Sequence, residues 1–245
     1  MMKLADHTAH YKRDADEFDY FAERSGADLD AAIRIQQAVM HEIPPHRGSR
    51  ILDIGSGGGW LHASLAQRIP EATVVSADLG LTNLRKLRRQ HPDALLVAAD
   101  AEQLPFRTGS FDTVIASEIL EHLNHPGQAV REAAAVLAPR GRYIVSTPYR
   151  EHLRYYLCIH CNQPTPANAH LHSFDEHSLS EIFLTAKLTG IRHFLFQNKA
   201  LVFLRISWLL RFLPFRLWKI IDRLSNLLVR KPHTIIISAE KLPST

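Results

Sequence analysis

Cysteine is scarce in this chain, whose 245 residues contain only two, Cys158 and Cys161. A single neighbouring pair does not make the disulfide framework that stabilises small secreted domains. The first residues, Met-Met-Lys-Leu-Ala-Asp-His, lack the apolar stretch of a secretory signal. The long apolar segment 201–213 is too short for a membrane span, which needs about 20 mainly apolar residues. The cytoplasm is therefore the expected compartment.

Strands and helices are expected to alternate along most of the chain. The expected strands are 50–54, 73–77, 95–99, 112–116, 142–147, 191–196 and 234–239. The expected helices are 14–24, 29–43, 60–69, 81–90, 126–138 and 175–189. Alternation of this kind predicts an α/β fold, in which helices cover both faces of a parallel sheet.

Residues 51–59 read Ile-Leu-Asp-Ile-Gly-Ser-Gly-Gly-Gly, an apolar strand that runs into a glycine-rich loop. Glycines let the backbone turn sharply and approach a ligand closely, and a helix from Trp60 would point its N-terminal N–H groups at the same space. This arrangement predicts a nucleotide-like ligand. The dinucleotide pattern G-x-G-x-x-G needs a glycine where the chain has Trp60. The pattern present is D-x-G-x-G-x-G, which begins at Asp53.

With this loop the chain resembles the class I S-adenosylmethionine-dependent methyltransferases of the type 11 and ubiquinone-pathway kind. Three further segments are similar to motifs of that family and follow in the same order: Asp78 at the end of a strand, Asp100 with the following Ala-Glu-Gln-Leu-Pro-Phe, and Ser-Glu-Ile-Leu-Glu-His-Leu at 117–123. The resemblance covers about 48–149. It implies S-adenosylmethionine as cofactor and a Rossmann-like, seven-stranded sheet, whose last two strands form an antiparallel hairpin at one edge.

The same resemblance assigns cofactor contacts. Asp78 would hydrogen-bond the two ribose hydroxyls, because a carboxylate suits a diol, and Asp100 would contact the adenine amino group. The full set of expected cofactor-binding residues is Asp53, Gly55, Ser56, Gly57, Gly59, Asp78, Leu79, Asp100, Ala101, Glu102 and Ser117.

A single domain is expected to cover 1–245, with N-terminal helices in 1–47 and a cofactor-binding core in 48–149. Two segments are additional to the family pattern. One, 150–174, precedes the last expected helix, and the other, 197–233, separates the last two strands. These insertions are where features particular to this chain are expected.

The first insertion concentrates cysteine and histidine. Tetrahedral zinc prefers cysteine and histidine ligands, and this segment offers four of them: Cys158, Cys161, His170 and His172. The C-x₂-C spacing lets both thiolates reach one ion. A structural zinc is one interpretation. Reduced thiols in a loop that covers the substrate are the alternative, since the spacing is not that of a standard zinc finger. His172 is also a candidate catalytic base, because a neutral imidazole can accept a proton from a hydroxyl group near pH 7.

Segment 117–123 offers a second possible metal site. In the ubiquinone-pathway O-methyltransferases that it resembles, two acids and a histidine, here Glu118, Glu121 and His122, can hold a divalent cation such as Mg²⁺. Positions i, i+3 and i+4 share one helical face. In relatives that hold no metal the same residues close the cofactor pocket. His122 is then a second candidate catalytic base, and the sequence leaves these alternatives open.

The second insertion is strongly basic. The chain has a net charge of +4, but 199–231 alone carries +7 and leaves −3 for the remainder. Only Asp222 opposes the basic residues of this segment. Those residues are Lys199, Arg205, Arg211, Arg216, Lys219, Arg223, Arg230 and Lys231.

Two apolar runs, 201–213 and 215–230, alternate with these charges and include Trp208 and Trp218. Aliphatic and tryptophan side chains beside arginines predict a pair of helices that lie on an anionic membrane surface, here the inner face of the membrane. The alternative is a cap that packs on its own domain or on a second subunit. So many aliphatic side chains argue against a nucleic-acid groove.

Together these features predict an enzyme that transfers a methyl group from S-adenosylmethionine to a small-molecule acceptor, lipid-linked or membrane-associated. One alternative is methylation of a soluble sugar or metabolite, with the basic segment as a dimer interface. Another is a scaffold that binds the cofactor without turnover. The acceptor atom and the oligomeric state are left open.

Overall fold

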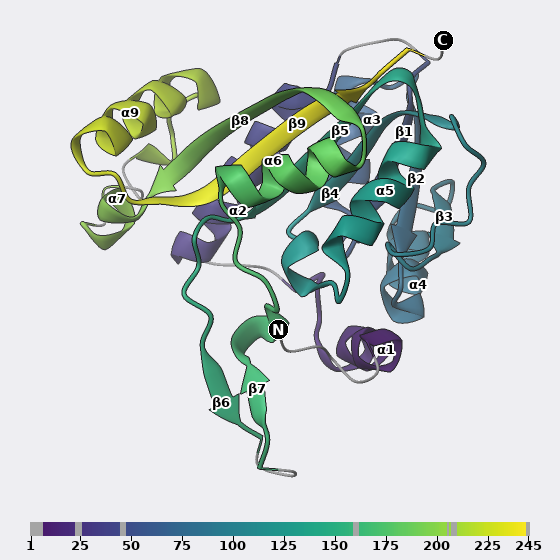
Figure 1. The fold of residues 1–245 in the computed structure, drawn as a ribbon, viewed down its shortest axis with the longest axis horizontal. Coiled ribbons are helices and arrows are strands. Elements are labelled where there is room, and N and C mark those ends of the chain that lie inside the picture. Colours follow the sequence, from purple (N-terminus) through teal and green to yellow (C-terminus); the bar gives the residue numbers. More distant parts are fainter. Residues whose placement is uncertain are drawn as a thin grey trace.

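The computed structural model describes residues 7–22, 26–44, 48–158, 162–204, 206 and 210–243. Within these residues the main sheet has the strand order β3-β2-β1-β4-β5-β9-β8 (Figure 1). Strands β1 to β5 run parallel, whereas β9 is antiparallel to both β5 and β8. The predicted α/β sheet, with an antiparallel hairpin at one edge, is confirmed. Its strands are β1 (Arg50–Ile54), β2 (Thr73–Asp78), β3 (Leu95–Ala98), β4 (Phe111–Ser117), β5 (Leu137–Pro148), β8 (Leu188–Asn198) and β9 (Pro232–Lys241).

Helices cover both faces of this sheet, as predicted (Figure 1). On one face, Val130 and Phe183 are fully buried in a large apolar cluster with the strands. On the other face, Val39 and Leu65 belong to a second cluster. Burial of each such side chain stabilises the fold by about 1.5–3 kcal/mol. These side chains come from α5 (Pro126–Val136), α6 (Glu176–Thr185), α2 (Gly26–Glu42) and α3 (Trp60–Arg68).

Both insertions leave the sheet at the edge where the parallel strands end. Pro148, at the end of β5, pairs with Thr234, and Phe196, near the end of β8, pairs with the same residue. The carboxyl edge of a parallel sheet is also where its ligands bind. The insertions contain the projecting hairpin β6 (Tyr155–Leu157) and β7 (Pro164–Pro166), then α7 (Lys199–Phe203) and α9 (Phe215–Leu228) (Figure 1).

Two helices, α1 (His7–Glu17) and α6, differ most from their predicted bounds. The helix predicted at 14–24 is α1, and the chain then turns at Tyr20, whose carbonyl presses against the glycine-rich loop at Gly58. This turn depends on a contact with a distant segment, which local sequence does not encode. α6 ends before residue 189 because Lys187 has a left-handed φ of 61° and β8 begins directly after it.

Candidate active site

The glycine-rich loop joins β1 to α3, as predicted. Gly55, Gly57 and Gly59 have φ values of 72°, 46° and 71°, which residues with a Cβ rarely adopt. A Cβ on Gly55 would also overlap Ile119, and one on Gly59 would overlap Leu87. At Gly57, by contrast, the nearest atom would lie 3.9 Å from a Cβ, so this side of the loop is open to a ligand.

Asp78 ends β2 and ties the loop together. Its two carboxylate oxygens accept hydrogen bonds from the backbone N–H groups of Gly57 and Gly80, each at 2.8 Å. The Asn83 amide, at the start of α4 (Leu81–Gln90), donates a longer one of 3.4 Å. Burial raises the pKa of Asp78, whereas these three hydrogen bonds lower it. The result is a preorganised acceptor at the pocket wall, which suits the hydroxyls of a ribose.

Asp53 lies beneath the loop. Asp53 is only 3% exposed. Burial, and secondly the nearby charge of Asp78, raises the pKa of Asp53 to about 7. Its Oδ2 atom has no hydrogen-bond partner in the described part of the chain. Leaving a buried polar atom unpaired costs about 1–3 kcal/mol, so a ligand or water that bonds to this oxygen would be stabilised there.

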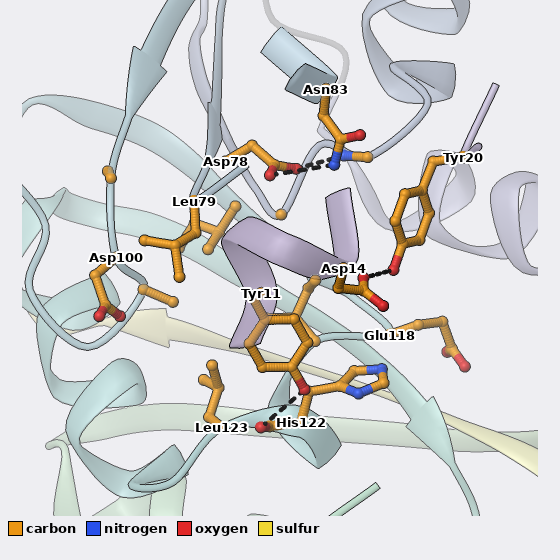
Figure 2. Close-up of a pocket in the computed structure, with 16 residues that line it drawn as sticks. Tyr11, Asp14, Tyr20, Asp78, Leu79, Asn83, Asp100, Glu118, His122 and Leu123 are labelled. Carbon is orange, nitrogen blue, oxygen red and sulfur yellow. Dashed lines mark hydrogen bonds between the residues drawn. The ribbon is translucent and has the colours of Figure 1, made fainter. Parts of the chain in front are cut away.

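A pocket opens above the loop, and the N-terminal segment forms one of its walls (Figure 2). The Tyr11 hydroxyl donates a hydrogen bond of 3.2 Å to the carbonyl oxygen of His122, and the Tyr20 hydroxyl contacts Asp14. The lining residues are Tyr11, Asp14, Tyr20, Ile54, Gly55, Gly57, Asp78, Leu79, Asn83, Ala99, Asp100, Ala101, Glu118, Ile119, His122 and Leu123.

The structure brings together six of the residues predicted to bind the cofactor. They are Gly55, Gly57, Asp78, Leu79, Asp100 and Ala101. Asp53, Ser56 and Gly59 shape the loop without lining the pocket.

Glu102 and Ser117 do not line the pocket, contrary to the prediction. The Glu102 carboxylate accepts a hydrogen bond from the backbone N–H of His125 at 2.7 Å and lies 2.6 Å from the ring nitrogen Nδ1 of the same residue. The Ser117 hydroxyl lies 2.9 Å from that of Ser146. Their positions next to the motif acids suggested a cofactor contact, but both side chains are held by neighbours outside the pocket.

Among the polar pocket residues, sequence reasoning missed Tyr11, Asp14, Tyr20 and Asn83. Asn83 lies five residues after a motif acid on the first turn of a helix, so its spacing is a usable signal. The other three come from a segment without a recognisable motif, and only the tertiary fold brings them to the pocket.

His122 lies at the pocket wall, as expected for a candidate base. It belongs to the short 3₁₀ helix η1 (Leu120–His122). Its ring makes edge contacts with Tyr11 and His170 at centroid distances of 5.8 and 4.7 Å. Burial, and secondarily His170, lowers the pKa of His122 to about 4, so the ring is neutral at pH 7. Its Nδ1 atom has no hydrogen-bond partner within the described residues.

The prediction that Glu118, Glu121 and His122 share one helical face is wrong. Glu118 has a left-handed φ of 56° and precedes η1, so it shares no helical face with the residues after it. Glu121 is 1% exposed. Its pKa is raised well above the usual range, first by burial and then by the charge of Glu118. A carboxyl group of this kind tends to stay protonated, which weakens it as a metal ligand.

The predicted zinc ligands are not brought together in the part of the chain that the structure describes. Cys161 lies outside the described residues. His172 is buried, and its Nε2 donates a hydrogen bond of 2.7 Å to the carbonyl oxygen of Leu123. This bond occupies the ring of His172 in the core, away from the pocket lining, so the prediction that His172 is a catalytic base also loses its geometric support.

His170 faces other partners. Its Nδ1 contacts the carboxylate of Glu151. Among the described residues, the side chains whose potential ligand atoms approach within 4.8 Å of one another are Glu121, His122 and His170, without Cys158. The insertion thus brings one histidine, His170, against His122 at the edge of the cofactor pocket, and the described residues do not form the predicted four-ligand centre.

Comparison with known proteins agrees with this geometry. Residues 52–145 match the family model described as a methyltransferase domain. A malonyl-[acyl-carrier protein] O-methyltransferase from Geobacter sulfurreducens is 36% identical over 129 residues, which are 49% of this chain and 48% of that protein. A ubiquinone biosynthesis O-methyltransferase from Ralstonia nicotianae is 34% identical over 137 residues, 49% of this chain and 56% of that protein. The chain spans about half the length of these curated relatives.

The fold matches a solved structure over most of its length. An S-adenosylmethionine-dependent methyltransferase from Mesorhizobium loti superposes with a TM-score of 0.60 at 16% identity, covering 86% of this chain and 100% of that one. The chain therefore has the class I S-adenosylmethionine-dependent methyltransferase fold, and its segment 52–145 matches the methyltransferase domain model, as the sequence resemblance implied.

Proposed function

We propose that this chain is an S-adenosylmethionine-dependent methyltransferase that acts on a small-molecule acceptor. The observation that carries the proposal is the pocket in which the open face of Gly57, the carboxylate of Asp78 and the acid Asp100 converge. Matching methyltransferase sequence over 52–145 supports it.

The pocket residues fit the cofactor. A Cβ on Gly55 or Gly59 would disturb the loop, and the open side of Gly57 leaves room for the amino-acid end. Asp78 would hold the ribose and Asp100, with Leu79 and Ala101, the adenine. S-adenosylmethionine supplies a methyl group on a positively charged sulfur, and that charge is lost during transfer. The protein's part is to orient the acceptor and exclude water.

His122 would accept the proton of the acceptor. It lines the pocket, it is neutral at pH 7, and its Nδ1 has no hydrogen-bond partner within the described residues. A positioned base of this type typically contributes a factor of about 10² to 10⁴ in rate.

The acceptor is lipid-linked or membrane-associated in this proposal. α9 turns Trp218 and Asp222 inward and leaves a stripe of aliphatic side chains exposed, flanked by Arg216 and Arg223. The exposed apolar residues of this stripe are Leu217, Ile220, Leu224, Leu227 and Leu228. An apolar stripe with a cationic border fits the interface of an anionic bilayer. No helix in the described ranges is long and apolar enough to cross one.

One element of the membrane prediction is wrong. Trp218 is 5% exposed and packs against Phe196 and Phe215, with the Arg34 guanidinium 4.9 Å from its ring centroid. It anchors α9 to the domain and does not face a membrane. Trp208 lies outside the described residues. The interface proposal therefore depends on the leucines of α9 and on the surrounding charges.

Exchange of Arg216 and Arg223 for glutamate is expected to release the protein from vesicles of mixed anionic and zwitterionic phospholipid. At about 1 kcal/mol per basic residue, loss of two cations lowers the affinity roughly 30-fold, and the new repulsion lowers it further. Cosedimentation measures this. A matched control is the pair Arg85→Glu and Arg89→Glu on α4, which makes the same charge change elsewhere and is expected to keep most of the binding. Equal binding by parent and the α9 variant, with a dimer lost in the variant, would favour a subunit interface and a soluble acceptor.

The activity itself is tested with methyl-labelled cofactor and a total membrane lipid extract. We expect a labelled lipid product, identified by mass spectrometry. Label in a soluble metabolite alone would contradict the lipid-linked acceptor. Cofactor binding without transfer to any acceptor would leave the scaffold alternative.

A further inference from the structure

Two cavities beside the cofactor pocket meet at shared residues. The first, which we call the basic cavity, lies under the β6–β7 insertion, and the second, the apolar cavity, lies between α2, α7 and α9. Lys199 and His233 line both. The junction follows from the fold, since the backbone N–H of Lys199 bonds to the carbonyl of Lys231 and that of Tyr149 to the carbonyl of His233. The two cavities therefore adjoin at Lys199 and His233, at the carboxyl edge of the sheet, and we call the pair the groove.

The basic cavity is suited to an anion. Its wall includes the cations Arg154 and Lys199, and in the described part of the structure no ion pair forms at either side chain. Its acid, Glu151, is already in contact with His170. Partial burial, followed by Lys199, lowers the pKa of His233. Cationic groups without a carboxylate partner around one cavity attract a multiply charged group such as a phosphate.

The apolar cavity offers the opposite environment. Leu201, Phe203, Leu210 and Trp218 line it. Its buried ionic groups are already satisfied within the fold. Arg34 donates hydrogen bonds to the carbonyl groups of Leu210 (2.7 Å), Arg211 (3.2 Å) and Leu213 (3.2 Å).

Asp222 completes the polar inventory of that cavity. It accepts backbone hydrogen bonds from Gln197 and Asn198 at 3.1 and 2.8 Å. The acids Asp28 and Asp30 also line this cavity. They disfavour an anion there, which places the anionic part of an amphiphile at the other end of the groove, near Lys199.

The groove also adjoins the cofactor pocket. His170 lines the basic cavity, and its ring packs edge-on against that of His122, which lines the cofactor pocket, at a centroid distance of 4.7 Å. A molecule in the groove would therefore extend from Leu201 and Phe203, past Lys199, to His170, which contacts the base proposed for methyl transfer.

We infer that this groove binds an amphiphilic acceptor whose phosphate group lies at Lys199 and Arg154, between an apolar chain in the apolar cavity and the methyl-accepting head near His122. The inference rests on the proposed function for the identity of the acceptor, but the groove itself is tested by binding alone. It gives the lipid-linked acceptor a chemical class, a lipid phosphate.

Calorimetry with the full chain and dodecyl phosphate, below its micelle concentration, tests the groove. We expect Lys199→Glu to weaken binding by about tenfold or more, the usual cost of a lost charge-assisted hydrogen bond. The matched control Arg89→Glu, which makes the same charge change at an exposed cation of α4 outside both cavities, is expected to bind like the parent. Leu201→Asp is expected to weaken the binding of dodecyl phosphate but not that of inorganic phosphate. Unchanged thermal melting of each variant excludes misfolding.

Two results would overturn the inference. Equal losses in Lys199→Glu and Arg89→Glu would mean that the phosphate is attracted by the surface charge as a whole and not by this site. Equal affinity for dodecyl phosphate and inorganic phosphate would mean that the groove has no site for the apolar chain. Equal affinity for dodecyl phosphate and tetraethylene glycol monododecyl ether would mean that it has no site for the phosphate. Binding of S-adenosylhomocysteine, measured on the same samples, reports separately on the proposed function, since Lys199 lies outside the cofactor pocket.

Discussion

Replacement of Asp78 by alanine is expected to weaken S-adenosylmethionine binding by about 1.5–3 kcal/mol, or roughly 10- to 150-fold. The carboxylate would hold the ribose. It also accepts hydrogen bonds from the backbone N–H groups of Gly57 and Gly80, and these bonds fix the conformation of the loop. Alanine removes both interactions. Calorimetry on the purified protein measures the change directly.

The matched control is Asp93→Ala, an exposed acid outside the pocket. It is expected to leave cofactor affinity unchanged. Thermal melting of Asp78→Ala without ligand separates a damaged loop from a lost contact. An affinity equal to that of the parent would remove Asp78 from the cofactor site.

Replacement of His122 by asparagine is expected to lower kcat about 10²-fold or more while cofactor affinity changes little, because a positioned base acts on the proton of the acceptor. The hydrogen bond from Tyr11 to residue 122 uses the backbone carbonyl and so survives the exchange. Single-turnover measurements with labelled cofactor distinguish the chemical step from product release.

His125→Asn is the control for this prediction, because His125 is an exposed neighbour that contacts Glu102 outside the pocket. The pH profile gives a second check. Burial lowers the pKa of His122 to about 4, so the base stays neutral and kcat is expected to decline only as the pH falls towards 4, not near 6.5. A variant with full kcat would show that another group, or none, takes the proton.

The cofactor-binding half of the site was predictable because its determinants are local. Asp53, the glycines after it and Asp78 stand at strand ends, and the order of strands along the chain fixes where those ends meet. Positive φ at Gly55 and Gly59 leaves few other residues possible. At these positions a short sequence motif and the local backbone conformation determine each other, and the structure places them at the strand ends as the sequence indicated.

The parts that failed depend on contacts between distant segments. The ring of His172 bonds to Leu123, 49 positions earlier in the chain, and no spacing rule reveals that this nitrogen is taken. α9 has apolar side chains on more than one side, so its sequence pattern alone did not show that Trp218 faces Phe196 while Leu224 stays exposed. The helical metal site failed because Glu118 adopts a left-handed φ before η1 begins.

The N-terminal segment gives the cofactor pocket a removable wall. Tyr11, Asp14 and Tyr20 reach the pocket from residues 7–22, and Lys86 pairs with Asp19 at 2.7 Å across the gap to α4. Polar surface contacts of this kind are weak and open more readily than a packed core. A fusion, tag or cleavage near residues 7–22 is therefore expected to change how long the proposed cofactor stays bound, even when every motif of the central sheet is intact.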